Sequence, residues 1–388
     1  MRLLFILPKV EPEKIQLPTV CPRPGCNGRH FKRFQEVIKR VRDTHFSEVK
    51  AYRYRCLRCG YLFRVYPVGI SRDHFSQRVK GLAVVLYLLG LSYGAVSLLL
   101  EALGWFMSKT LVYRTVQEAA RRVPGMKRKA VFEGIQTPAI GSDVTSVKVK
   151  GKWYPIGVVV DERTGLVLTV DGLAGEDAKT LKEWLEPVVE AVGAQVLVTD
   201  DADAFKEVAD ELGLAHPVCT NHVQRNTERL VEELRGLAEG DADGSLRAIG
   251  VSPAQAVADL DRLKQLVRER RPEGGKEIGK MLEKYLPARP PREGEKASVA
   301  YRIRLLLLDR WNLWPRLTKY RQWEGPNGER LNGTNNGSER AIGWWIKERY
   351  RTMRGYKREE SAVNVSRLLA WCGNHLKRGG APLAMVLG

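Results

Sequence analysis

Three acidic residues of this sequence have the type and setting to hold a metal ion together. Asp143 interrupts an apolar stretch, Asp200 directly follows another, and Glu339 stands in an asparagine-rich segment with 138 residues between it and Asp200. A hard cation such as Mg²⁺ prefers clustered oxygen ligands, and phosphoryl-transfer sites often draw carboxylates from separate elements. A charge inside an apolar strand is costly unless it is paired or metal-bound, so Asp143 in particular indicates function.

The elements around these acids follow a recognisable order. Strand-like alternation over 139–149 and 153–160 flanks a tight turn at 150–152. The next expected elements are a strand at 166–170, a helix at 177–192, a strand at 195–199 and a helix at 203–212. Three meandering strands followed by helix, strand and helix is the order of the ribonuclease H-like fold. Phosphotransfer enzymes of that fold carry one carboxylate on the first strand and another just after the fourth, where Asp143 and Asp200 fall.

Other acids compete for these roles. Asp201 stands beside Asp200 and is an alternative second ligand, although it also suits a turn or helix-entry position, where an acid interacts favourably with the helix dipole. Asp161 and Asp171 are followed by turn residues, and we predict that both are solvated.

Four of the six cysteines form two short pairs. Cys21 and Cys26 are separated by four residues, Cys56 and Cys59 by two, and 29 residues lie between the pairs. Tetrahedral Zn²⁺ takes four thiolates, and two tight turns at the ends of a β-hairpin deliver them. We predict a zinc ribbon over 1–70. Two free thiol pairs are the plain alternative, and His30 could replace one ligand.

A helical segment follows at 71–125. Helices are expected at 75–91, 93–103 and 109–123, with Ser92 and Ser108 as N-caps. A short helix, a glycine and a basic helix are typical of a helix-turn-helix whose last helix enters the DNA major groove, although plain packing modules look alike. The expected DNA-binding residues on the last helix are Lys109, Arg114, Arg121 and Arg122.

The charge of the chain is concentrated in its first third. Residues 1–130 contain 25 Lys and Arg against 8 Asp and Glu, which accounts for 17 of the net +19. Clustered positive charge releases phosphate counterions when DNA binds. No apolar run reaches the roughly 18 residues of a membrane span, and the cysteine usage is not that of a disulfide scaffold. A cytoplasmic, nucleoid-associated protein is therefore expected.

The long interval before Glu339 is helical in pattern. Helices are expected at 227–237, 252–268, 275–285 and 299–320, which predicts a helical insertion domain over 227–331. Trp311, Trp314 and Trp323 close it. Tryptophans at helical spacing are usually core residues, but one could stack on an unpaired base of bound DNA.

Several motifs together resemble those of insertion-sequence DDE transposases of the bacterial type related to the Mutator group. The motifs are Ser142-Asp143, Val198-Thr199-Asp200-Asp201, the segment His216 to Asn226 with its Cys219-x-x-His222 element, and Asn335-Asn336-Gly337-Ser338-Glu339-Arg340. The likeness covers about residues 137–375, and a zinc ribbon plus helix-turn-helix in front is usual for such enzymes.

The resemblance implies a function and a set of residues. Asp143, Asp200 and Glu339 would be the catalytic triad and would bind Mg²⁺ or Mn²⁺. From their residue types, we expect Cys219 and His222 to have a structural role nearby, as a buried apolar residue and an orienting hydrogen-bond partner; a share in holding a metal such as Zn²⁺ is the alternative. The Asn335–Asn336 pair would cap the helix that carries Glu339. The basic residues expected along bound DNA after this acid are Arg340, Lys347, Arg351 and Arg354.

The implied fold is multidomain: a ribbon and helix-turn-helix, then an α/β ribonuclease H-like catalytic domain formed by 137–226 and 332–378 around the insertion. The implied partners are double-stranded DNA, as terminal inverted repeats and target, and a second copy of the chain. Two alternatives stay open: a catalytically inactive DNA-binding regulator derived from a transposase, and a structure-specific nuclease of the same fold.

Overall fold

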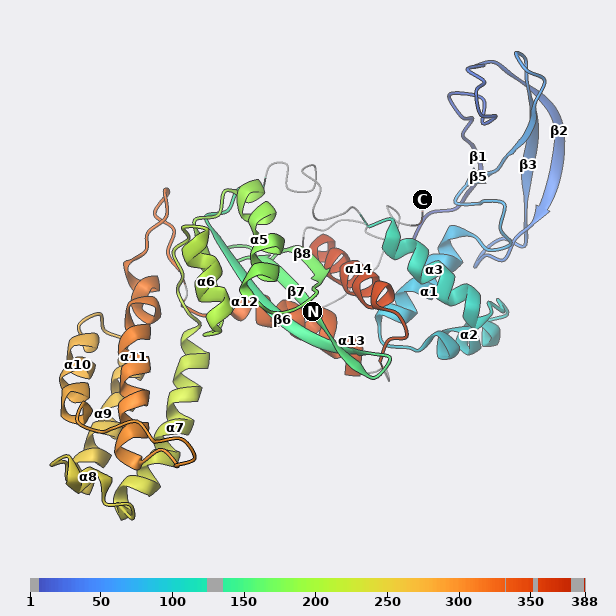
Figure 1. The fold of residues 1–388 in the computed structure, drawn as a ribbon. Helices are drawn as coiled ribbons and strands as arrows, with labels where there is room; N and C mark the ends of the chain where they lie inside the picture. Colours follow the sequence, from blue (N-terminus) through green and yellow to red (C-terminus); the bar gives the residue numbers. More distant parts are fainter. Residues whose placement is uncertain (1–6, 124–134, 332, 352–354, 378–386, 388) are drawn as a thin grey trace.

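The computed structural model describes residues 7–123, 135–331, 333–351, 355–377 and 387. Three kinds of structure follow one another along the chain (Figure 1): a strand-rich N-terminal part, a group of three helices, and a mixed α/β part from which a long group of helices projects.

The N-terminal part contains two small sheets. Strands β1 (Glu11–Ile15) and β5 (Pro67–Val68) pair with each other. The longer β2 (Phe31–Arg40), β3 (Glu48–Cys56) and β4 (Leu62–Val65) form an antiparallel sheet in the order β2-β3-β4. Both cysteine pairs lie at one end of this second sheet, because β3 ends at Cys56 and Cys59 lies in the turn into β4.

Three short helices follow, each begun by a serine. They are α1 (Gln77–Leu88), α2 (Tyr93–Ala102) and α3 (Lys109–Arg121). The hydroxyls of Ser76, Ser92 and Ser108 each accept a hydrogen bond from the backbone N–H three residues later, which satisfies one free donor of the first turn. The N-caps predicted at Ser92 and Ser108 are thus confirmed.

The α/β part is built on one four-stranded sheet, in the order β8-β7-β6-β9. Strands β6 (Ala139–Val149), β7 (Lys152–Asp161) and β8 (Val167–Gly172) form an antiparallel meander, and β9 (Val196–Val198) runs parallel to β6. Lys150 and Gly151 both have positive φ, at 50° and 83°, which suits a two-residue hairpin turn between β6 and β7.

Helices cover both faces of this sheet (Figure 1). Side chains of a strand alternate between faces. Val159 accordingly packs with α5 (Ala178–Val192) and α6 (Asp203–Glu211), whereas Val158 and Val160 pack with α12 (Asn336–Ile342) and α14 (Glu359–Lys377). The apolar core on the α12 and α14 face of the sheet also includes buried residues of α1 and α3. The three-helix group is therefore continuous with the α14 side of the α/β part.

A second group of helices has its own apolar core. It consists of α7 (Thr220–Gly240), α8 (Ser245–Ala248), α9 (Pro253–Glu269), α10 (Gly274–Tyr285) and α11 (Val299–Gln322), and it projects from the end of the sheet opposite the three-helix group (Figure 1). Helix α7 begins seven residues before the predicted start at 227 and runs without interruption from the sheet edge into this group.

The tryptophans of this region differ in their surroundings. Trp314 is buried, its Nε1 donates to the carbonyl oxygen of Arg271 over 3.1 Å, and Gly274 packs against its ring. Trp311 is 45% exposed, and Trp323 packs against the core that contains β9. The expected core role therefore fits Trp314, while Trp311 presents a ring to solvent.

The prediction of two solvated turn carboxylates is wrong. Asp161 is 2% and Asp171 3% exposed. Asp161 accepts a hydrogen bond from Thr137 Oγ1 over 2.7 Å, and Asp171 accepts one from Trp184 Nε1 over 3.0 Å. A buried carboxylate is stable only when hydrogen-bond donors surround it. These donors come from neighbouring elements, so both acids connect the end of a strand to another part of the fold.

Candidate active site and metal centres

The pairing of β6 and β9 sets Asp143 beside Asp200. Gly141 and Val198 are direct partners on these parallel strands, and each acid lies two residues further along its own strand direction. Residues two apart on a strand share a face. Asp143, within β6, and Asp200, just after the end of β9, are therefore at the same level of two neighbouring strands.

Helix α12 brings Glu339 to the same place. Asn335, at the start of this helix, is buried, and its Nδ2 donates to the carbonyl oxygen of Ser142 over 3.0 Å. A Cβ on Gly141 would meet Asn335 Oδ1 at 2.9 Å and a Glu162 oxygen at 1.9 Å, so only glycine lets α12 approach the strand this closely. The helix carrying Glu339 is thus fastened to the residue just before Asp143.

The expected cap at Asn335 needs correction. The residue occupies the N-cap position, but its side chain makes no capping hydrogen bond to the helix backbone. Its oxygen accepts from the Ser338 hydroxyl instead, and its amide reaches across to β6. Asn335 joins two elements rather than satisfying the first turn of one.

The acids influence one another electrostatically. Burial, followed by the charge of Asp200, raises the pKa of Asp143 to about 7, and Glu339 adds to the increase. The backbone N–H of Val144 and the charge of Lys347 act in the opposite direction. A buried carboxylate among like charges is the arrangement that a bound cation relieves.

The neighbour Asp201 is directed elsewhere. It lies 2.8 Å from Lys206 Nζ on α6, and its charge acts on Asp309, whereas Asp200 is the neighbour that raises the pKa of Asp143. The geometry favours Asp200 over Asp201 as a partner of Asp143.

Cys219 and His222 lie beside Glu339. Both stand at the start of α7, and the Glu339 Oε1 atom lies 3.9 Å from Cys219 Sγ and 3.5 Å from His222 Nδ1. Cys219 is fully buried, and its Sγ accepts the backbone N–H of Asn335 over 3.4 Å. The Cys–His element thus lies beside Glu339, and it begins a helix rather than ending a strand.

A buried histidine that sequence reasoning left without a role supports the Asp200 strand end. His216 is 3% exposed, its Nε2 lies 2.8 Å from Thr199 Oγ1, and its Nδ1 lies 2.8 Å from Arg316. Arg316 also makes two hydrogen bonds to Asp210, at 2.7 and 2.8 Å. This network joins α6 and α11 to the residue before Asp200. Burial, followed by the charge of Arg316, lowers the pKa of His216 to about 3.

Glu162 is a second residue that sequence reasoning missed. It follows Asp161 at the end of β7, lies beside Gly141 and Gly337, and has a buried oxygen with no hydrogen bond among the described residues. Burial, then the charge of Asp161, raises its pKa to about 7. Its place after a turn aspartate gives no signal in the sequence, because only the approach of α12 encloses it.

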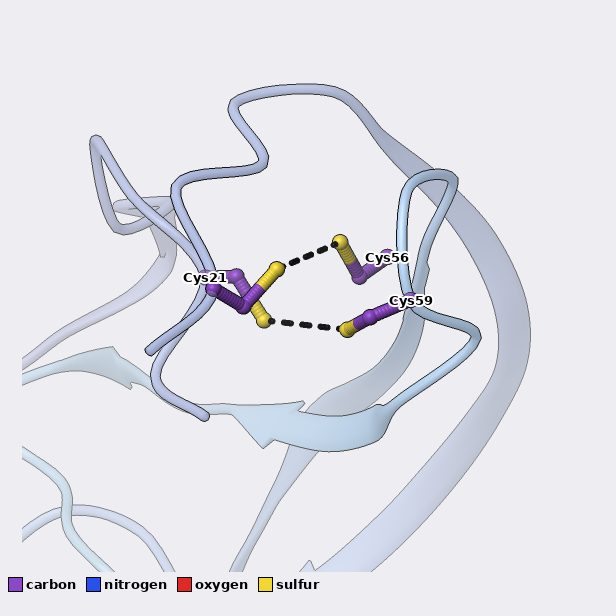
Figure 2. A group of neighbouring side chains, drawn as sticks. Cys21, Cys56 and Cys59 are labelled. Atoms are coloured by element: carbon purple, nitrogen blue, oxygen red, sulfur yellow. Dashed lines mark hydrogen bonds between the residues drawn. The ribbon is translucent and has the colours of Figure 1, made fainter. Parts of the chain in front are cut away.

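The four N-terminal cysteines converge, as Figure 2 shows. The Sγ atoms of Cys21 and Cys59 lie 3.8 Å apart and those of Cys26 and Cys56 lie 3.9 Å apart, too far for disulfides. Zn–S bonds of about 2.3 Å in a tetrahedron separate sulfur atoms by about 3.8 Å. His30 is not part of the cluster. The two measured sulfur–sulfur distances thus match the edges of a zinc tetrahedron, and all four sulfur atoms lie within 4.8 Å of one another.

The predicted DNA-binding residues divide into two groups. On α3, Lys109 and Arg114 are exposed, whereas Arg121 pairs with Glu360 of α14 over 3.2 Å and Arg122 pairs with Glu118 over 2.7 Å. After Glu339, Arg340 and Lys347 are exposed. The Arg351 side chain and all of Arg354 lie outside the described residues.

No protein-family model matches the sequence, and no curated protein matches it. Among solved structures, the magnesium complex of the HTLV-2 integrase catalytic core domain is 21% identical over 32% of this chain and 84% of that chain, with a TM-score of 0.19. The BIV integrase catalytic core is 16% identical over 53% and 99%, also at 0.19.

A simian T-cell lymphotropic virus intasome, in complex with the PP2A regulatory subunit B56 gamma, is 18% identical over 41% of this chain and 62% of that chain, with a TM-score of 0.20. The structural neighbours are thus retroviral integrases, and at these scores the likeness carries no assignment. Within the described ranges, no helix is both long and apolar enough to cross a membrane.

Proposed function

We propose that this chain is a DDE transposase that cleaves transposon ends and joins them to target DNA. The observation that carries the proposal is the convergence of Asp143, Asp200 and Glu339 from two strands and a helix, where partial burial, followed by the charges of Asp200 and Glu339, raises the pKa of Asp143. Clustered carboxylates repel one another and would also repel the phosphates of DNA. Bound cations remove both repulsions, and this gives the cluster a use in phosphoryl transfer.

The donor set suits Mg²⁺ or Mn²⁺, since hard oxygen ligands from separate elements leave open positions for substrate oxygens. Bound there, such ions would act as Lewis acids on the scissile phosphate and lower the pKa of an attacking hydroxyl. The part of the chain in this reaction is to hold the three carboxylates in place: β6 and β9 fix the two aspartates, and Asn335 fixes the helix of Glu339.

The proposal assigns DNA binding to the basic surfaces. Residues 1–70 would be a zinc ribbon held by Cys21, Cys26, Cys56 and Cys59, and 71–125 a helix-turn-helix. Lys109 and Arg114 of α3 are exposed and form no ion pair within the described residues, whereas Arg121 and Arg122 would have to leave their acidic partners. Arg340, Lys347, Arg351 and Arg354 would contact DNA near the acids.

The same proposal assigns the remaining chain. Residues 137–226 and 332–378 would be a ribonuclease H-like catalytic domain and 227–331 its helical insertion, with the exposed ring of Trp311 available for stacking on a base. Two DNA ends must be brought together for joining, so the active form would be a dimer on DNA.

The test is a joining reaction. Purified protein is incubated with a linear fragment containing the DNA that flanks its gene, a supercoiled target plasmid and Mg²⁺. Joined products are expected. Cuts without joining would assign a nuclease, and binding without either would assign a DNA-binding regulator derived from a transposase.

A further inference from the structure

Glu339 lies beside two side chains that bind softer metals than Mg²⁺. Cys219 Sγ and His222 Nδ1 lie 3.9 and 3.5 Å from Glu339 Oε1, and the three ligand atoms all lie within 4.8 Å of one another. Within the described residues, this group and the four N-terminal cysteines are the two clusters with such spacing.

The spacing matches the edges of a zinc tetrahedron. Zinc bonds of about 2.3 Å to sulfur and 2.0–2.2 Å to nitrogen and oxygen separate sulfur from oxygen by about 3.6 Å, and nitrogen from oxygen by about 3.4 Å. The observed distances differ from these by a few tenths of an ångström. A small rotation of side chains would therefore complete three of four ligand positions.

The local fold prepares two of the ligands. Cys219 and His222 are three residues apart at the start of α7 and so face the same side. The N–H of Asn335, at the start of the helix that carries Glu339, donates to Cys219 Sγ over 3.4 Å and so orients the sulfur toward that helix. His222 Nδ1 is buried and forms no hydrogen bond within the described part of the chain, which leaves its lone pair available.

We propose that Cys219, His222 and Glu339 form a Zn²⁺ site that competes with the Mg²⁺ site for Glu339. A thiolate and an imidazole select Zn²⁺ over Mg²⁺, and the fourth position is left for water. A Glu339 oxygen fixed in this site is no longer free to serve beside Asp143 and Asp200. Zn²⁺ therefore inhibits the enzyme, a consequence that rests on the proposed strand-transfer function.

The first experiment measures zinc content alone. Wild type, His222→Gln, Cys219→Ser and the control His74→Gln, which replaces an exposed histidine of the N-terminal third, are equilibrated with buffered Zn²⁺ and analysed for bound metal. We expect one zinc fewer per chain in each of the first two variants than in wild type, and the wild-type value in the control. Zinc bound by the four N-terminal cysteines contributes equally to wild type and variants, so it does not affect the difference in zinc content between them. Equal zinc in all four proteins would overturn the site.

The second experiment measures inhibition, comparing each protein with itself. The zinc concentration that halves Mg²⁺-dependent strand transfer should rise at least tenfold in His222→Gln and Cys219→Ser but not in His74→Gln. An unchanged value would overturn the competition. Because the Cys219 side chain is fully buried, a melting curve accompanies that variant, and the 42% exposed His222 side chain provides the test if it does not fold. If the wild type shows no strand transfer at all, the proposed function is refuted. The difference in zinc content between wild type and the two variants would still decide whether this zinc site exists.

Discussion

The cysteine cluster and the carboxylate cluster are built in opposite ways. The four thiols come from two turns within 39 residues, and they are brought together by one antiparallel sheet. The three acids come from β6, the end of β9 and α12, and the last two are separated by a whole group of helices. A local cluster can form with its metal as it folds, whereas the carboxylates meet only when the entire α/β part is assembled.

The electrostatics of the two clusters differ as well. Zinc binding to thiolates contributes directly to the folding free energy, on the order of 10 kcal/mol in small zinc domains. The acids destabilise the metal-free protein, since the pKa of Asp143 rises on folding. Zinc bound by the cysteines would stabilise the N-terminal part as it folds. A metal ion bound by the three acids would need the α/β part to be folded first.

Neutralising any one acid should abolish catalysis but not folding. Asp143→Asn, Asp200→Asn and Glu339→Gln each remove a negative ligand while keeping shape, and we expect strand transfer to fall by about a thousandfold or more. Asp201→Asn is the matched control, since its ion pair with Lys206 is worth on the order of 1 kcal/mol. Strand transfer, melting temperature and DNA affinity are measured together. An active Asp200→Asn with an inactive Asp201→Asn would move the ligand by one residue.

Replacing the N-terminal thiols should have the opposite effect: metal content and DNA binding should fall, while the α/β part stays folded. Cys56→Ser with Cys59→Ser should release one zinc per chain and weaken DNA binding by about tenfold or more, because the N-terminal sheet loses its metal. The α/β part should keep its melting transition, since its cores contain none of these residues. Elemental analysis and fluorescence anisotropy check both points. Unchanged zinc content would contradict the assignment of the cluster.

Asn335 tests how far the acids depend on distant contacts. Asn335→Ala removes the hydrogen bond to the Ser142 carbonyl and leaves that oxygen buried without this donor, at a cost of about 1–3 kcal/mol. We expect strand transfer to fall by about ten- to a hundredfold. Asn336→Ala, at the next residue, is the control. Equal loss in both variants would mean that the whole helix start, rather than this contact, is responsible.

The His216 network predicts acid sensitivity of the α/β part. The folded-state pKa of about 3 lies below the unfolded value of about 6.5, so above pH 6.5 the histidine contributes no pH dependence. As the pH falls below 6.5, the unfolded chain binds a proton that the folded chain does not, and stability is lost. The loss amounts to about 2 kcal/mol at pH 5. His216→Gln should be less stable than wild type at pH 7.5 but lose less between pH 7.5 and 5. Urea unfolding at both pH values checks this, and parallel losses in the two proteins would contradict it.

The local structure was largely predictable from the sequence. The bounds of β6 and the serine starts of α2 and α3 agree with expectation, since alternation and capping depend on neighbouring residues. The burial of Asp161 and Asp171 was not predictable, because it depends on Thr137 and Trp184 from other elements.

The candidate site follows the same division. The residues Asp143, Asp200 and Glu339 could be named from motifs, but the supports around them could not. Glu162, His216 and the cross-link from Asn335 to β6 owe their positions to how α11 and α12 pack against the sheet. Sequence patterns named the candidate residues, and only tertiary packing supplied their positions.

Helix α7 has a mechanical consequence. Its 21 residues span about 32 Å at 1.5 Å per residue, with Cys219 and His222 at one end and the α8–α9 tip at the other. A tilt of about 5° around the inner end would displace the tip by about 3 Å and the inner side chains by only a fraction of an ångström. Because Cys219 and His222 stand at the inner end of α7, a displacement at the α8–α9 tip would reach the proposed zinc site reduced to less than an ångström.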